Sequence, residues 1–129
     1  MLEYEYKNGV TNHETIYGIL PISSDDSKGY RPFELLVSSI VGCSSGVLYK
    51  ILEKKRMKVE AIRIQSNVER KKEEANKVTE ISLHYIIEGT GLKEEQIKKS
   101  IEMAFKNCAM VQSVKDSIKI SESFEVINH

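Results

Sequence analysis

The sequence has little cysteine, little histidine and no excess of charge of either sign. Two cysteines, Cys43 and Cys108, in a chain expected to stay in a reducing compartment make a structural disulfide the poorest interpretation of the pair. The three histidines, His13, His84 and His129, lack the close spacing of a metal site, so no metal centre is expected. Lys plus Arg and Asp plus Glu number 19 each, and without a net field neither nucleic acid nor a membrane is an expected partner.

Long hydrophobic runs are also missing. The uncharged stretch 35–49 contains four serines and is shorter than the roughly 20 apolar residues that cross a bilayer. Residues 1–9 carry acids where a signal peptide has a basic region and an apolar core. We therefore expect a cytoplasmic protein, and its length suits a single domain over residues 1–129.

Alternation of apolar and polar residues predicts a hairpin near the N-terminus. Residues 2–7 alternate, and Asn8-Gly9 follows them, which is the strongest two-residue signal for a hairpin with a type I′ turn. The return strand is expected over 10–22. One face of that strand would collect Ile16, Gly18, Leu20 and Ile22. The polar segment 23–31 then reads as a loop.

Three further strands are predicted in the second half of the chain, over 59–70, 77–88 and 118–127. The alternation in 77–88 places His84 outward with Glu80 and Ser82, and the inward residues are Ile81, Leu83, Tyr85 and Ile87. The mixed-charge segment 70–77 is expected to be a solvated hairpin tip. Residues 92–108 have the apolar period of a helix that turns Cys108 inward, and a short turn or helix follows it. The order β-β-α-β-β-α-β predicts an α+β fold with a mainly antiparallel sheet.

One long helix, residues 32–56, is the centre of the predicted fold. Pro32 suits its first position, and apolar residues then occupy all sides of the helix, which predicts that it is buried. Small side chains surround Cys43, so another backbone can approach closely. The other residues of this group are Ser38, Ser39, Gly42, Ser44, Ser45 and Gly46.

The two inward-facing cysteines have two interpretations. Both can be packing residues, because free cysteine is among the most buried residue types. Alternatively, one thiolate attacks a peroxide, becomes a sulfenic acid and forms a disulfide with the other thiol. That chemistry needs a lowered thiol pKa, whereas a mid-helix position in apolar surroundings raises it, so we expect a cation from elsewhere in the fold to assist Cys43.

The motif RPFELLVSSIVGC, followed later by AFKNCAMVQSVK and a closing strand, resembles the OsmC/Ohr family of osmotically inducible and organic hydroperoxide resistance proteins. The resemblance covers nearly the whole chain. It implies two sheets with long central helices, an intertwined homodimer and reduction of organic hydroperoxides. In this family Cys43 would be the peroxidatic cysteine and Cys108 the resolving one. An external dithiol, such as a lipoyl group, would reset the disulfide, and no bound cofactor is implied.

The sequence departs from the pattern of the proven peroxidases and is closer to a less characterised OsmC-like branch. Those enzymes carry a glutamate directly after the helix-opening proline, where this chain has Phe33 and then Glu34. Glu34 and Cys43 are nine residues apart and leave opposite sides of a helix, so Glu34 would act only across a dimer. Residues 1–22 contain no arginine, which makes Arg31 the first candidate for the activating cation.

Lys28 and Arg63 are the further candidates for the cation, and Ala109 stands where the family usually has proline after the second cysteine. An apolar wall around Cys43 would favour alkyl or lipid hydroperoxides. It would consist of Leu36, Ile40, Val47 and Phe105. The alternative function is a non-catalytic dimer that binds an apolar small molecule or acyl chain.

Overall fold

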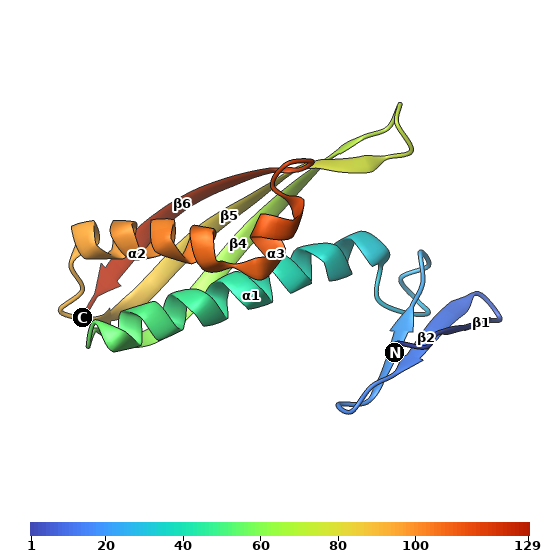
Figure 1. The fold of residues 1–129 in the computed structure, drawn as a ribbon, viewed down its shortest axis with the longest axis horizontal. Coiled ribbons are helices and arrows are strands. Elements are labelled where there is room, and N and C mark those ends of the chain that lie inside the picture. Colours follow the sequence, from blue (N-terminus) through green and yellow to red (C-terminus); the bar gives the residue numbers. More distant parts are fainter. The chain divides into compact units, whose positions relative to one another are not determined.

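A computed structural model describes all residues, 1–129 (Figure 1). It has six strands and three helices, and its internal contacts group into two compact units, residues 1–38 and 39–129. Each unit contains one three-stranded sheet. The α+β class follows directly, whereas the single domain over 1–129 stays a prediction.

The first unit is built on the predicted hairpin. Strands β1 (Glu5–Lys7) and β2 (Val10–Glu14) pair antiparallel. The turn between them has positive φ angles, 54° at Asn8 and 82° at Gly9, as a type I′ turn requires. The hairpin prediction is therefore confirmed at its turn.

The predicted return strand 10–22 is wrong, because it is divided into β2 and β3 (Ile19–Ile22) by a second tight turn. The Thr15 hydroxyl accepts hydrogen bonds from the backbone N–H groups of Tyr17 and Gly18, at 3.1 and 3.0 Å. Such a side-chain bond offers the backbone an alternative to the ladder. Ile16, expected on the inner face, is instead fully exposed at the tip of this turn.

Helix α1 (Pro32–Lys54) begins at the predicted proline and ends two residues before the predicted end. Its buried residues, Ile40, Ser44, Leu48 and Leu52, recur every fourth position and form one narrow stripe. The prediction that the helix is buried on all sides is thus wrong for a single chain, in which Gly42 and Gly46 are exposed. By length and composition alone α1 could cross a membrane, a property that core helices of soluble proteins share.

The second unit contains the main sheet, with strand order β4-β5-β6 (Figure 1). β4 (Lys58–Lys71) and β5 (Lys77–Thr90) form the predicted antiparallel hairpin. β6 (Lys119–Asn128) pairs with β5 in parallel, because the chain crosses over through two helices between these strands. The inward residues predicted for β5 are all fully buried. They are Ile81, Leu83, Tyr85 and Ile87.

Helices α2 (Glu94–Asn107) and α3 (Ala109–Val114) lie with α1 on one side of this sheet (Figure 1). α2 buries Ile97, Ile101 and Ala104, as its apolar period predicts. Cys108 is not the last residue of a helix, since it joins α2 to α3 in an extended conformation, with φ −84° and ψ 110°. Its side chain is nevertheless fully buried, so the expectation that Cys108 points inward is confirmed.

Gly89 marks a close approach between β4 and β5. The register shifts between Val59 and Ala61, which makes Glu60 an extra residue in β4 and brings the Lys58 carbonyl oxygen against the Gly89 Cα. A Cβ at position 89 would collide with that oxygen. Only glycine fits this position without displacing the backbone.

We predict that Gly89→Ala lowers the free energy of unfolding by about 1–3 kcal/mol, because the strands must separate to admit the methyl group. Urea denaturation followed by circular dichroism measures the change. Thr90→Ala is the control, since Thr90 is exposed in the same strand and its truncation should change the free energy by less than about 0.5 kcal/mol. Equal stability of both variants would contradict the assignment.

Candidate functional site

The structure brings the two cysteines together. Cys43 lies in the middle of α1 and is half-buried, whereas Cys108 is fully buried at the junction of α2 and α3. Both thiols are free, and the Cys108 thiol lies close enough to the Cys43 sulfur to lower the pKa of Cys43. Two residues 65 positions apart in the sequence therefore share one site, and one of them is accessible to small molecules.

Neutral hydrogen-bond donors lower the pKa of Cys43 below the ordinary value of a thiol. The largest contribution comes from the backbone N–H of Met110, followed by the Cys108 thiol, and the N–H of Ala109 adds to them. Burial acts in the opposite direction and is outweighed. The charged form of Cys43 is favoured because each donor bonds more strongly to a thiolate than to a thiol.

These donors differ from the cation expected from the sequence. The N–H groups belong to the first turn of α3, where backbone donors have no partner inside the helix. Ala109 is one of them, and a proline at this position would have no N–H to donate. The departure from the family pattern after the second cysteine therefore gives this chain an additional donor to Cys43.

A chain of buried polar side chains leads away from Cys108. The Ser44 hydroxyl, on the buried stripe of α1, donates to the Cys108 sulfur at 3.3 Å. Ser44 also lies close enough to the Tyr85 hydroxyl of β5 to lower the pKa of that phenol. Tyr85 in turn donates to Oε2 of Glu122 on β6 at 2.7 Å. α1, β5, β6 and the α2–α3 junction each contribute one member of this network.

Burial changes the acidity of the two distal members. The pKa of Tyr85 is raised far above its ordinary value, first by burial and then by the nearby Glu122 charge, so the phenol stays protonated. Burial also raises the pKa of Glu122, against the hydrogen bond from Tyr85, which lowers it. Glu122 is therefore a stronger base than an exposed carboxylate.

None of these three residues was predicted from the sequence to belong to the site. Tyr85 was identified only as an inward residue of its strand, and Ser44 only as a small neighbour of Cys43. Glu122 carried a usable signal, because it occupies an inward position between Ile120 and Phe124 in the alternation of β6. A charged residue on the apolar face of a strand needs a buried partner.

Arg31 and Glu34 belong to the first unit. The Arg31 guanidinium lies 4.8 Å from the centre of the Phe33 ring, a cation–π contact with the residue that replaces the family's glutamate. Glu34 is exposed in the first turn of α1. Their roles toward Cys43 stay predictions.

The other two cation candidates, Arg63 and Lys28, are both exposed. Arg63 is exposed on the face of β4 opposite to the one that the helices cover, so it does not reach Cys43 within the second unit. Lys28 is exposed in the loop before α1, where hydrogen bonds from Ser27 lower the pKa of Asp25 and the Lys28 charge adds to them.

A cavity of about 490 Å³ lies between α1 and α2. Val47 is one helical turn beyond Cys43 and Asn107 directly precedes Cys108, although neither cysteine lines the cavity. No acidic side chain lines it, and three lysines surround its apolar floor. The remaining lining residues are Lys50, Ile51, Lys54, Lys55 and Met103.

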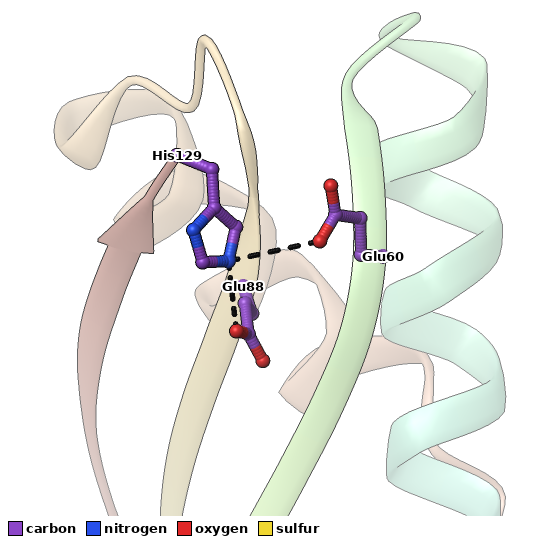
Figure 2. Close-up of side chains that lie close together, drawn as sticks. All are labelled: Glu60, Glu88 and His129. Carbon is purple, nitrogen blue, oxygen red and sulfur yellow. Dashed lines mark hydrogen bonds and ion pairs between the residues drawn. The ribbon is translucent and has the colours of Figure 1, made fainter.

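A histidine–carboxylate cluster joins Glu60 of β4, Glu88 of β5 and His129 after β6 (Figure 2). Nε2 of His129 lies 2.8 Å from Glu88 Oε1 and 3.7 Å from Glu60 Oε2, and these donor atoms lie within 4.8 Å of one another. Glu60 reaches His129 from the bulge in β4. One ring nitrogen serves both carboxylates, so an exposed ion pair accounts for the cluster. The spacing of histidines in the sequence gave no sign of it.

His84, predicted to face outward, shares its face with polar neighbours. Its Nδ1 lies 2.7 Å from the Ser123 hydroxyl, and its Nε2 lies 3.6 Å from Glu125. Both partners come from the adjacent strand β6. The histidine therefore has a role in cross-strand pairing.

Comparison with known proteins gives consistent results. The chain is 28 % identical to Protein YhfA of Escherichia coli strain K12 over 110 residues, which make up 84 % of this chain and 82 % of that protein. A hypothetical protein from Aquifex aeolicus VF5 has a crystal structure that matches with a TM-score of 0.90 at 26 % identity, covering 100 % of this chain and 96 % of that one.

A third match is the crystal structure of an organic hydroperoxide resistance protein OsmC from Legionella pneumophila. Its TM-score is 0.74 at 15 % identity, over 98 % of this chain and 96 % of that chain, which shows a shared fold. The family described as OsmC-like protein matches residues 24–123, a span that includes both cysteines and the Ser44–Tyr85–Glu122 network. The chain therefore belongs to the OsmC-like protein family.

Proposed function

We propose that this protein is a cytoplasmic, thiol-dependent peroxidase that reduces organic hydroperoxides in defence against oxidative stress. The Cys43 thiolate attacks the terminal peroxide oxygen, the O–O bond breaks, and the alkoxide leaves and takes a proton to become an alcohol. Cys43 is then a sulfenic acid. Cys108 attacks its sulfur, water leaves, and a disulfide remains that an external dithiol, such as a lipoyl group, reduces.

The observation that carries this proposal is the contact of the two thiols with one of them held toward its ionised form. Packing cysteines need no donors near their sulfur, whereas two backbone N–H groups and the Cys108 thiol lower the pKa of Cys43. A nucleophilic cysteine needs this environment, together with access for the substrate. Cys43 is half-buried, which meets the second requirement.

The surroundings of the thiols favour alkyl or lipid hydroperoxides. Ile40 is buried one turn before Ser44, and Phe105 is half-buried close to the α2–α3 junction. An alkyl tail that packs against such residues gains about 0.8 kcal/mol per CH₂ group relative to water. Hydrogen peroxide has no group that could make this contact.

The exposed face of α1 supports the proposal that the protein works as a homodimer. Gly42 and Gly46 lie on this face, and an added Cβ at either position meets no atom within 4 Å in the single chain. Small residues let a second backbone approach closely, and the partner's Arg31 and Glu34 are the proposed source of additional charge near Cys43.

A second candidate function is supported by the cavity between α1 and α2. Its apolar floor and three lysines suit an acyl chain with an acidic head, as expected for a non-catalytic binding protein. In that case both cysteines would be packing residues. The two functions differ in turnover and in the effect of removing a sulfur atom.

We predict that Cys43→Ser abolishes the consumption of cumene hydroperoxide in the presence of reduced dihydrolipoamide. Cys108→Ser should still react once, leaving a sulfenic acid on Cys43 that dimedone traps. The loss of peroxide from the solution measures turnover, and mass spectrometry of the intact protein detects the dimedone adduct. Wild-type protein that consumes no more peroxide than Cys43→Ser, and that copurifies with a fatty acid, would favour the binding protein instead.

We predict that Ala109→Pro raises the pKa of Cys43, because proline removes one of the N–H groups that lower it. The extended conformation of Cys108 accepts a following proline, so α3 should persist. The rate of iodoacetamide alkylation against pH measures the pKa, and its midpoint should move to higher pH. Ala109→Ser keeps the N–H and should leave the midpoint unchanged. A Cys43 midpoint near 8.5 or above in the wild type would refute an activated thiolate.

We predict that the protein sediments as a dimer at micromolar concentration and that Gly46→Glu dissociates it, because a charge on the uncovered face of α1 prevents close packing. Sedimentation velocity measures the mass. Gln65→Glu adds the same charge on the exposed face of β4 and should leave the dimer intact. A stable wild-type monomer would contradict the proposal.

A further inference from the structure

We propose that Ser44, Tyr85 and Glu122 form a proton path that removes the proton of Cys108 when this residue attacks Cys43. The proposal rests on the resolving step of the proposed function. It assigns Ser44 to direct contact with the reacting sulfur and Tyr85 and Glu122 to positioning roles behind it.

The need for such a path follows from the burial of Cys108. Only a thiolate attacks sulfur, so the Cys108 thiol has to lose its proton before the disulfide forms. Its side chain is 0 % exposed, and its neighbours Ser44 and Tyr85 are 1 % and 0 % exposed, so no bulk water reaches this proton directly. A hydrogen-bonded chain of side chains is the available route.

The contacts of Ser44 and Tyr85 link Cys108 to Glu122. Ser44 Oγ lies 3.3 Å from the Cys108 sulfur, Ser44 lies close enough to the Tyr85 hydroxyl to lower its pKa, and Tyr85 donates to Glu122 Oε2 at 2.7 Å. Both hydroxyls can donate and accept, whereas the carboxylate only accepts. A proton that enters at Cys108 therefore leaves at Glu122.

The path ends at the surface. Glu122 lines a second cavity of about 340 Å³ on the side of α2. The charged groups that face it there are Glu102 and Lys106, and from β5 it faces Tyr85. The proton can be passed on to solvent in this cavity. Burial raises the pKa of Glu122, which brings its basicity closer to that of a thiolate and eases the transfer.

The transfer balances in atoms and charge. The Ser44 hydroxyl first turns from the Cys108 sulfur, to which it donates at rest, toward the Tyr85 oxygen. Cys108 then gives its proton to Ser44 Oγ, the Ser44 hydroxyl proton moves to Tyr85, and the Tyr85 proton moves to Glu122. The Cys108 thiolate then forms the S–S bond, and hydroxide leaves the Cys43 sulfenic acid and takes a proton from solvent to become water. Glu122 returns its proton to solvent. The organic hydroperoxide of the preceding step is the oxidant.

Ellman's reagent tests the path without any peroxide. Cys43 attacks the reagent and releases one thionitrobenzoate, and the attack of Cys108 on the resulting mixed disulfide releases a second one. In Glu122→Gln we expect an unchanged first phase. The second phase should slow about tenfold or more near neutral pH, since a general base contributes roughly 10²–10⁴-fold. The rate of the second phase rises with pH, and in Glu122→Gln this rise should occur at higher pH than in the wild type.

Two controls separate this effect from a loss of structure. Glu125→Gln makes the same change on the exposed face of β6 and should leave both phases unchanged. Glu122→Gln keeps an acceptor for Tyr85, and thermal unfolding should show no loss of stability. The raised pKa means that wild-type protein loses stability as pH rises through it, whereas the glutamine variant does not.

Tyr85→Phe interrupts the path at its centre and should slow the second phase like Glu122→Gln. A second phase at the wild-type rate in both variants would overturn the proton path. Failure of the proposed function is a different result, in which the wild type shows both phases with the reagent but consumes no organic hydroperoxide.

Discussion

The contact between Ser44 and Cys108 is the interaction on which the site depends. It joins the centre of α1 to the junction of α2 and α3, directly above Tyr85 of the main sheet. Because Ser44 follows Cys43, the same register that directs the Ser44 hydroxyl to Cys108 also directs the Cys43 sulfur to the first N–H groups of α3. A shift of α1 by one residue would rotate it by about 100° and break both contacts together. The buried stripe of α1, with an isoleucine and two leucines packed on the sheet side, prevents that rotation.

Much of the fold could be predicted from periodicity, because long elements give long patterns. The inward residues of β5 and the buried face of α2 followed from periods of two and 3.6 residues. The predictions fail where a single short-range or long-range interaction determines the local structure. At Thr15 one hydroxyl makes a turn inside an otherwise regular alternation. At β6 the direction of pairing depends on how the two intervening helices cross the sheet, and no pattern within the strand records that crossing. The uncovered side of α1 is a third case, since a helix that is apolar on all sides does not tell which part its own chain covers.

The site was only partly accessible from the sequence. Cys43 and Cys108 could be predicted as site residues from the sequence. The structure adds their proximity and the donors around Cys43. The sequence does not show which backbone N–H groups lie near a given side chain, so it could not reveal the source of the lowered Cys43 pKa. A cation was expected in its place. Tyr85 and Glu122 were hidden for a different reason. Tyr85 obeys the alternation of its strand and Glu122 interrupts that of β6, but their pairing becomes visible only when the parallel register of β5 and β6 is known. In that register Leu83, and not Tyr85, lies directly opposite Glu122.

The same geometry explains how this chain can depart from the peroxidase pattern and keep a reactive sulfur. A glutamate and arginine pair stabilises a thiolate through charge, which requires both groups to be ionised and correctly placed. Backbone N–H groups are dipoles fixed by the fold, and they stabilise a thiolate without a second ionised group. Here Phe33 contacts the Arg31 guanidinium, and Ala109 has an N–H that proline would lack. Activation by amides therefore depends on the position of α3 relative to α1, and so on the packing of Cys108 against Ser44. In the proposed peroxidase reaction, the resolving thiol of Cys108 would then also hold in place the N–H groups that lower the pKa of Cys43.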